Sequence, residues 1–113
     1  MKGSSIVGLA TLASALCIGV AAAAEEGSQP ADAGRVLFEQ RCGGCHMEGG
    51  FGTRVLARRV PEGQGELAKR DVLPADFTTA VVRQGIGSMP QIREAELGDA
   101  ELQAIARYLD KGQ

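Results

Sequence analysis

The segment Cys42-Gly43-Gly44-Cys45-His46 constrains this chain more than any other part of its sequence. A C-x-x-C-H run is the attachment signature of a c-type haem. Two thiols at this spacing can reach the two vinyl groups of one porphyrin, while the adjacent imidazole lies under the iron. Glycines between the thiols let the backbone turn tightly against the macrocycle. We therefore predict one haem c, held covalently by Cys42 and Cys45, with His46 as an iron ligand.

Three other interpretations of this segment account for less. A C-x-x-C pair also forms dithiol redox sites, but the chain lacks the βαβ pattern that normally surrounds one. A disulfide across so short a loop would add little stability and would leave His46 without a role. A zinc site needs four ligands, whereas His46 is the only histidine of the chain. Haem attachment explains all three side chains.

The first 24 residues have the pattern of an export signal. A lysine near the start is followed by an apolar run over residues 6–20 and by Ala22-Ala23-Ala24 at a predicted cleavage site. We predict that cleavage leaves a single domain, residues 25–113, in the periplasm and without a membrane span. An uncleaved N-terminal anchor is an alternative. Lipidation at Cys17 is less favoured, because a bulky leucine precedes that residue.

The predicted mature chain is too small to build a large core by itself. Removing 24 residues from 113 leaves 89, and a chain of this size buries only about 60% of its unfolded surface. It has three phenylalanines, one tyrosine and no tryptophan, so a bound haem would complete the core. Loss of Lys2 reduces the 12 basic residues to 11 against 14 acidic ones. The resulting net charge of −3 excludes the basic excess typical of nucleic-acid-binding domains.

Elimination leaves one methionine for the far side of the iron. The N-terminal methionine would leave with the signal, and Met47 adjoins His46 and cannot reach the opposite face. Met89 remains, in a glycine-rich segment where Pro90 forces it toward an extended conformation. We predict that Met89 is the second axial ligand. The alternatives are that Met89 fills a gap in the core, that the iron position is open, or that Lys69 ligates it.

Histidine–methionine ligation has consequences for function. It raises the reduction potential, and a closed sixth position argues against oxygen or peroxide chemistry. The sequence therefore favours an electron carrier, not an enzyme, whose iron cycles between ferrous and ferric states. A haem enzyme or gas sensor would need an open iron position and distal acid–base groups, and the chain has no second histidine to serve as one.

The spacing of apolar residues predicts three main helices joined by loops. The first covers roughly residues 32–41 and runs into the attachment segment, and the last covers about residues 99–111. A middle helix follows Leu73-Pro74 and ends near Gly85. Sustained alternation of period two is absent, so the fold class is all-α. One or two shorter helical pieces are expected in the glycine-rich loop region, at residues 55–59 and 62–69.

In this order of elements, residues 32–110 resemble class I bacterial cytochromes c. The resemblance implies a small cytochrome c fold, in which three main helices and their loops wrap around one covalent haem. It implies electron exchange with redox partner proteins: a dehydrogenase, an oxidase or another cytochrome. It further implies that the first and last helices cross, with contacts among Gly34, Phe38, Leu102, Ile105 and Tyr108.

Two details near the motif concern groups that would contact the histidine ligand or the haem propionates. Family members usually carry Gly-Pro soon after the motif, and a carbonyl there accepts the Nδ1–H of the ligand histidine. Here Phe51 follows the glycine, so we expect a nearby loop carbonyl, or that of Pro61, to orient the imidazole. Arg58 and Arg59 follow Leu56 much as a propionate-binding arginine follows a leucine in the family, which makes both candidates for propionate contacts.

The C-terminal part of the chain carries a second, narrower resemblance. Residues 73–110 are similar to the cytochrome subunits of flavin-dependent dehydrogenases such as p-cresol methylhydroxylase. This likeness implies an alternative to a freely diffusing carrier, namely a tightly bound cytochrome subunit that accepts electrons from a flavin-dependent or other periplasmic dehydrogenase. The basic residues of the loop region could serve haem propionates, an acidic partner or solvation alone: Arg54, Arg58, Arg59, Lys69 and Arg70.

Overall fold

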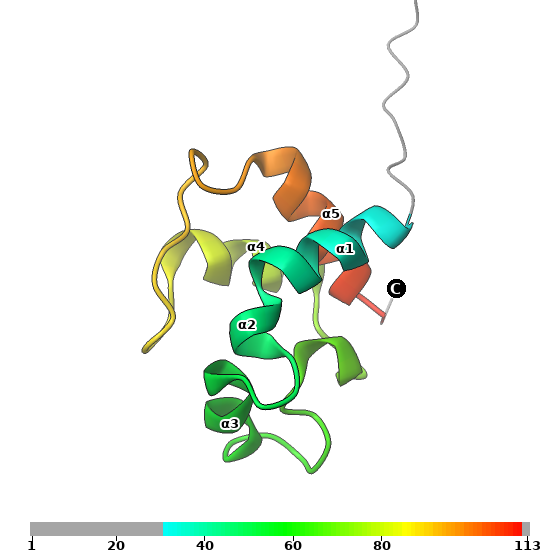
Figure 1. The fold of residues 1–113 in the computed structure, drawn as a ribbon, viewed down its shortest axis with the longest axis vertical. Coiled ribbons are helices and arrows are strands. Elements are labelled where there is room, and N and C mark those ends of the chain that lie inside the picture. Colours follow the sequence, from blue (N-terminus) through cyan, green and yellow to red (C-terminus); the bar gives the residue numbers. More distant parts are fainter. Residues whose placement is uncertain (1–30, 112–113) are drawn as a thin grey trace, which may run out of the picture.

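The computed structural model describes residues 31–111, so the predicted signal, its cleavage site and Cys17 lie outside the described residues. Within that part all named elements are helical (Figure 1), and the one strand-like pairing is a bridge between Ile86 and Met89. This confirms the all-α prediction. No helix in the described stretch is long and apolar enough to cross a membrane. The elements are α1 (Ala31–Arg41), α2 (Gly43–His46), α3 (Phe51–Ala57), the 3-10 helix η1 (Leu67–Lys69), α4 (Ala75–Gln84) and α5 (Asp99–Leu109).

The first and last helices cross at a glycine. A Cβ at Gly34 would lie 2.3 Å from the carbonyl oxygen of Ala104 and 2.8 Å from the Cβ of Tyr108, so only glycine permits this approach. One turn further along α1, Phe38 is 1% exposed, and its ring centroid lies 5.8 Å from that of Tyr108. The predicted crossing of α1 and α5 is therefore confirmed (Figure 1).

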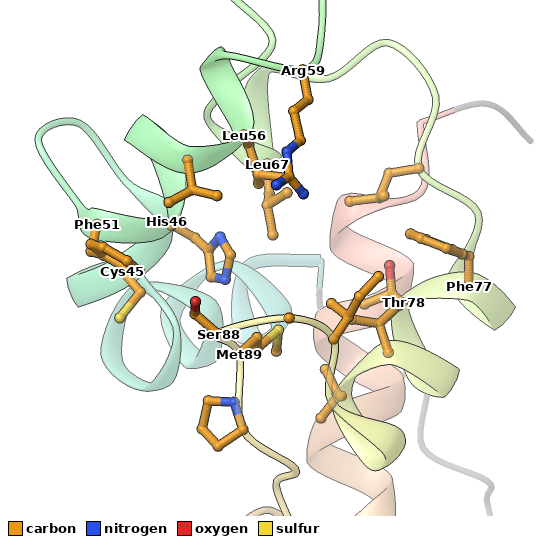
Figure 2. A pocket seen from close by; sticks show the side chains of 18 of the residues that line it. Cys45, His46, Phe51, Leu56, Arg59, Leu67, Phe77, Thr78, Ser88 and Met89 are labelled. Carbon is orange, nitrogen blue, oxygen red and sulfur yellow. The ribbon is translucent and has the colours of Figure 1, made fainter.

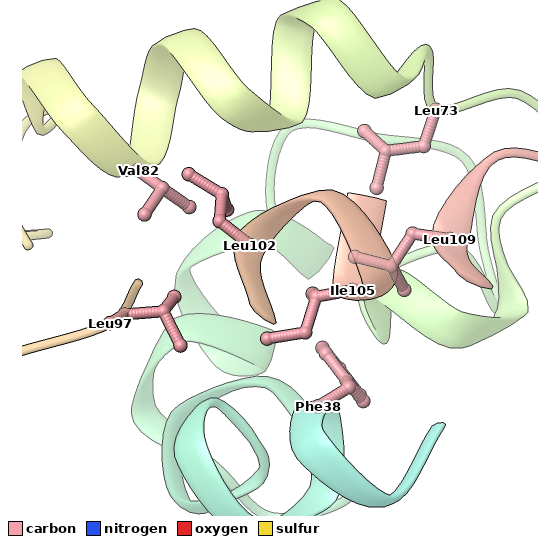
Figure 3. Close-up of a cluster of buried hydrophobic side chains, with 7 residues drawn as sticks. All are labelled: Phe38, Leu73, Val82, Leu97, Leu102, Ile105 and Leu109. Atoms are coloured by element: carbon pink, nitrogen blue, oxygen red, sulfur yellow. The ribbon is translucent and has the colours of Figure 1, made fainter. Parts of the chain in front are cut away.

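The last helix is the central element of the core. Its side chains pack on α1 on one side and on α4 on the other, and the backbone N–H of Ala75 at the start of α4 donates to the Asp110 carboxylate at 3.1 Å. At Asp110 the backbone has left the helical conformation, so α5 ends at Leu109, two residues before the predicted limit. The core cluster in Figure 3 consists of Phe38, Leu73, Val82, Leu97, Leu102, Ile105 and Leu109.

A tight turn after α4 carries Met89. Gly85 ends the helix with a φ of +74°, a conformation that favours glycine. Ile86 and Met89 then exchange both backbone hydrogen bonds, at 3.1 and 2.9 Å. Further on, the N–H of Ile92 donates to the carbonyl of Val82 at 2.9 Å. The turn is thus folded back on α4, with Met89 half-buried.

The two short helical pieces predicted in the loop region are placed differently in the structure. The piece predicted at 55–59 belongs to α3, which begins earlier, at Phe51. The piece predicted at 62–69 is reduced to η1. A helix cannot run through its first half, because Gly63 has a φ of +82° and Glu66 is extended.

Replacing Gly34 with valine tests the crossing. The added side chain would overlap the Ala104 carbonyl and Tyr108, so we expect the free energy of unfolding to fall by at least about 2 kcal/mol. Chemical denaturation of the purified protein measures this change. Gln40→Ala, at an exposed position of the same helix, should alter it by less than about 0.5 kcal/mol. Equal losses in the two variants would contradict the close contact.

Candidate functional site

A cavity of about 340 Å³ lies between the attachment segment and the turn after α4. Cys45 and His46 line it from α2, and Ser88 and Met89 line it from that turn (Figure 2). The rest of the wall comes from α3, η1, α4 and the segments that adjoin them, and it is mainly apolar. The fold therefore brings to one cavity the two side chains that the sequence predicts as axial ligands.

The attachment segment continues from α1 almost without interruption. The N–H of Cys42 donates to the carbonyl of Phe38 at 2.8 Å, and the carbonyl of Cys42 accepts from the N–H groups of Cys45 and His46 at 3.1 and 3.0 Å. Both thiols are free. Cys45 is exposed and lines the cavity, whereas Cys42 is half-buried, packs against the core and is not part of the lining.

The environment of Cys42 bears on the dithiol alternative. Burial raises the pKa of its thiol, and the neighbouring Cys45 raises it further. A dithiol redox site works through a thiolate stabilised by a lowered pKa. The shift at Cys42 has the opposite sign, which weighs against this thiol as the nucleophile of thiol–disulfide exchange.

The imidazole of His46 is half-buried and poised as a neutral ligand. Burial lowers its pKa, and the positive charge of Arg70 lowers it further. A metal-ligating histidine must be deprotonated at the ligating nitrogen, so both effects favour ligation near pH 7. The backbone at Gly52 lies against the ring, because a Cβ there would be 2.9 Å from Cε1 and 3.0 Å from Nδ1 of His46.

The expected carbonyl partner of His46 is not found. Its Nδ1 is buried and makes no hydrogen bond in the described structure. The candidate acceptors are engaged elsewhere: the carbonyl of Gly50 accepts the N–H of Arg54 at 3.1 Å, and that of Pro61 accepts the N–H of Gln64 at 3.1 Å. Because α3 begins directly after Gly50, the Gly50 carbonyl is used by the helix. The prediction of a loop or Pro61 carbonyl is therefore wrong for this structure.

The charged part of the cavity wall is entirely basic. Besides His46, its ionisable side chains are Cys45, Arg59 and Arg70, and no carboxylate of the described residues belongs to the lining. Figure 2 shows the guanidinium group of Arg59 directed toward the cavity. Arg58, the other predicted candidate, is exposed and is not part of the wall. A basic wall in a chain with a net negative charge suits a ligand that carries carboxylates.

Lys69 is poorly placed to be the sixth ligand. Its Nζ forms an ion pair with Glu66 at 2.6 Å, its side chain is 61% exposed, and it does not line the cavity. Met89 lies in the wall and also packs against the core cluster. The geometry therefore favours Met89 over Lys69 as the iron ligand. Met89 also contributes to core packing.

The cavity has two further features that fit a ligand that is mainly apolar and also carries polar groups. Three large apolar side chains of the lining are about half exposed or more: Phe51 at 55%, Phe77 at 51% and Ile86 at 60%. A group bound in the cavity would cover apolar surface that otherwise faces water. In addition, the Thr78 hydroxyl is buried without a hydrogen-bond partner, and Thr78 lines the cavity. The residues present therefore fit haem.

Neither Thr78 nor Arg70 was predicted from the sequence to be a residue of the site. Thr78 lies on the apolar side of α4, one turn before Val82, and a polar residue at such a position is a signal that could have been noticed. Arg70 was included only as part of a basic stretch. It directly follows η1, and its Nε donates to the carbonyl of Gln64 at 3.2 Å.

An all-helical fold, a C-x-x-C-H turn and a cavity with histidine and methionine in its wall define a c-type cytochrome domain. The sequence family described as cytochrome c oxidase, cbb3-type, subunit III matches residues 29–109, and the chain belongs to it. Membership establishes covalent haem c as the cofactor and haem-based electron transfer as the general role. Comparisons with curated proteins and with solved structures gave no match.

The two neighbouring arginines give a matched test of the basic wall. Arg59→Gln removes a positive charge from the cavity, so we expect the oxidised iron to be stabilised and the midpoint potential to fall, by roughly 30–60 mV for about 1 kcal/mol. Arg58→Gln removes the same charge outside the cavity and should change it much less. Redox titration measures both. Equal shifts in the two variants would remove Arg59 from the site.

Proposed function

We propose that this chain is a periplasmic electron-transfer protein in which Cys42 and Cys45 hold a single haem c and in which His46 and Met89 ligate its iron. The observation that carries the proposal is the shared apolar cavity of His46 and Met89, with Cys45 in the same wall. When bound, haem c supplies an iron that gains and loses one electron without bond breaking.

The side chains of the chain have separate tasks in this proposal. His46 binds as a neutral imidazole, and the lowered pKa supports this state. Met89 would ligate the iron through its thioether sulfur, a ligand that raises the reduction potential. The apolar wall excludes water, and Arg59 and Arg70 offset the charge of the propionates. No side chain in the described wall is asked to transfer a proton, and the protein acts as a carrier, not as a catalyst.

The proposal places the protein in the periplasm because of the sequence of its first 24 residues. Residues 1–24 are a cleaved export signal, and residues 25–113 are the cytochrome domain. The proteins that exchange electrons with it are redox proteins of the same compartment: a dehydrogenase, an oxidase or another cytochrome. Family membership supports an exported protein with redox partners in general.

An intact-mass measurement of protein from the periplasmic fraction tests attachment and export together. We expect the mass of residues 25–113 plus one haem. Cys45→Ala should retain one thioether bond at most. The double variant Cys42→Ala, Cys45→Ala should lose covalent haem and accumulate far less, because the cofactor completes the core. Normal yields of a compact haem-free double variant would contradict the proposal, and a mass that includes residues 1–24 would contradict cleavage.

The alternative role is a cytochrome subunit that remains bound to a flavin-dependent dehydrogenase. It is supported by the similarity of residues 73–110 to such subunits. Gel filtration of the native periplasmic extract distinguishes the two roles. A flavoprotein that co-elutes with the haem absorbance supports the subunit, whereas elution at the mass of a monomer supports the carrier.

A further inference from the structure

Arg83 makes the most extensive polar contacts of any basic residue in the described chain, and it lies outside the cavity wall. Its side chain, in the last turn of α4, is only 24% exposed. Its guanidinium group donates to the carbonyls of Ile92 and Leu97, at 2.9 and 3.0 Å, and to the Asp99 carboxylate at 2.5 Å. One side chain thus joins α4, the segment after Met89 and the start of α5.

Arg83 lies before the loop that carries Met89, and its acceptors lie after that loop. Ile92 lies three residues after Met89, and its peptide groups are bound to α4 on both sides: its N–H donates to Val82 at 2.9 Å, and its carbonyl accepts from Arg83. Leu97 is 2% exposed and belongs to the core cluster. The guanidinium group therefore ties the far end of the loop both to the helix before it and to the buried core.

The loop has few other restraints. The side chains on either side of Met89 are exposed, including those of Ser88, Pro90 and Gln91. Segments with few buried contacts open locally at a small fraction of the global free energy of unfolding. Hydrogen bonds from a charged donor are stronger than neutral ones, and the rigid planar fork of arginine presents its donors to several acceptors in a fixed geometry, unlike the compact ammonium group of lysine. Beside the backbone hydrogen bonds between Ile86 and Met89 and from Ile92 to Val82, Arg83 is thus the main side-chain restraint on opening of the loop.

We propose that Arg83 is a positioning residue that holds the Met89 loop closed and so sets how readily an outside ligand replaces Met89 on the iron. The inference rests on the proposed ligation by Met89. Replacement requires that the iron–sulfur coordination bond break and that the entering nitrogen ligand bind in its place. The apparent affinity for the entering ligand is then reduced by the small fraction of molecules in which the loop is open.

Imidazole titration of the ferric holoprotein measures that fraction. Arg83→Met keeps the aliphatic stem but removes all three polar contacts, so we expect imidazole to bind about 10- to 100-fold more tightly than to the wild type. Arg83→Lys keeps the charge without the planar guanidinium group, so its imidazole affinity should lie between those of the wild type and Arg83→Met. This variant replaces Arg83→Met in the test if Arg83→Met does not accumulate. Hydrogen exchange at the Ile92 N–H in the reduced protein should accelerate in the same order.

Two controls separate positioning from general destabilisation. Arg93→Gln removes an arginine of the same loop that is 84% exposed and pairs only with Glu96, so its effect should stay within about twofold. Ile105→Val loosens the core around α1 and α5 and should lower the free energy of unfolding without tightening imidazole binding. An increase in affinity for Ile105→Val as large as that for Arg83→Met would overturn the inference.

Met89→Ala separates this inference from the function on which it rests. If Met89 is the ligand, this variant binds imidazole tightly whether or not Arg83 is present. Tight binding by Met89→Ala, with wild type and Arg83→Met equally weak, overturns the role of Arg83 and leaves the ligation intact. Equal binding by wild type and Met89→Ala means that Met89 does not ligate the iron, and both proposals fail.

Discussion

The close contact between α1 and α5 at Gly34 is the constraint on which the rest of the structure depends. Because Ala104 and Tyr108 leave no room for a Cβ, the two helices are locked in one relative position. α1 runs directly into the attachment segment, so this contact also fixes where His46 lies. α5 packs against α4 on its other side, and α4 ends in the turn that carries Met89. α5 thus supports both the wall that carries His46 and the wall that carries Met89.

The cavity explains why so small a chain needs a cofactor. Large apolar side chains on α3, on α4 and in the turn face the cavity while remaining half exposed, and the buried hydroxyl of Thr78 has no partner. In a domain of this size the buried core is marginal without an added apolar group. Covalent haem, established by family membership, would cover these side chains. The basic wall beside Arg59 and Arg70 suits the propionates, the polar part of that cofactor.

Local patterns in the sequence predicted the features that depend on local physics. The spacing of apolar residues gave α1, α4 and α5 close to their observed limits, and the attachment segment identified the cofactor. The limits of the short helices between His46 and Leu73 were predicted less well, because the positive φ of Gly63 overrides helix propensity there. The lack of a hydrogen-bond partner for His46 Nδ1 in the described structure was not predicted, because it depends on which carbonyls α3 already uses. Arg83 carries no sequence signal, since its acceptors lie 9 to 16 residues away.

The central claim is that His46 and Met89 are the two ligands of one haem iron, and an absorption spectrum tests it most directly. The purified protein is recorded oxidised, then reduced, and then reduced with carbon monoxide. The structure leads us to expect a weak far-red sulfur-to-iron band in the oxidised spectrum and no response of the reduced protein to carbon monoxide. Absence of that band together with a prompt shift on adding carbon monoxide would contradict the claim and would identify an open iron position.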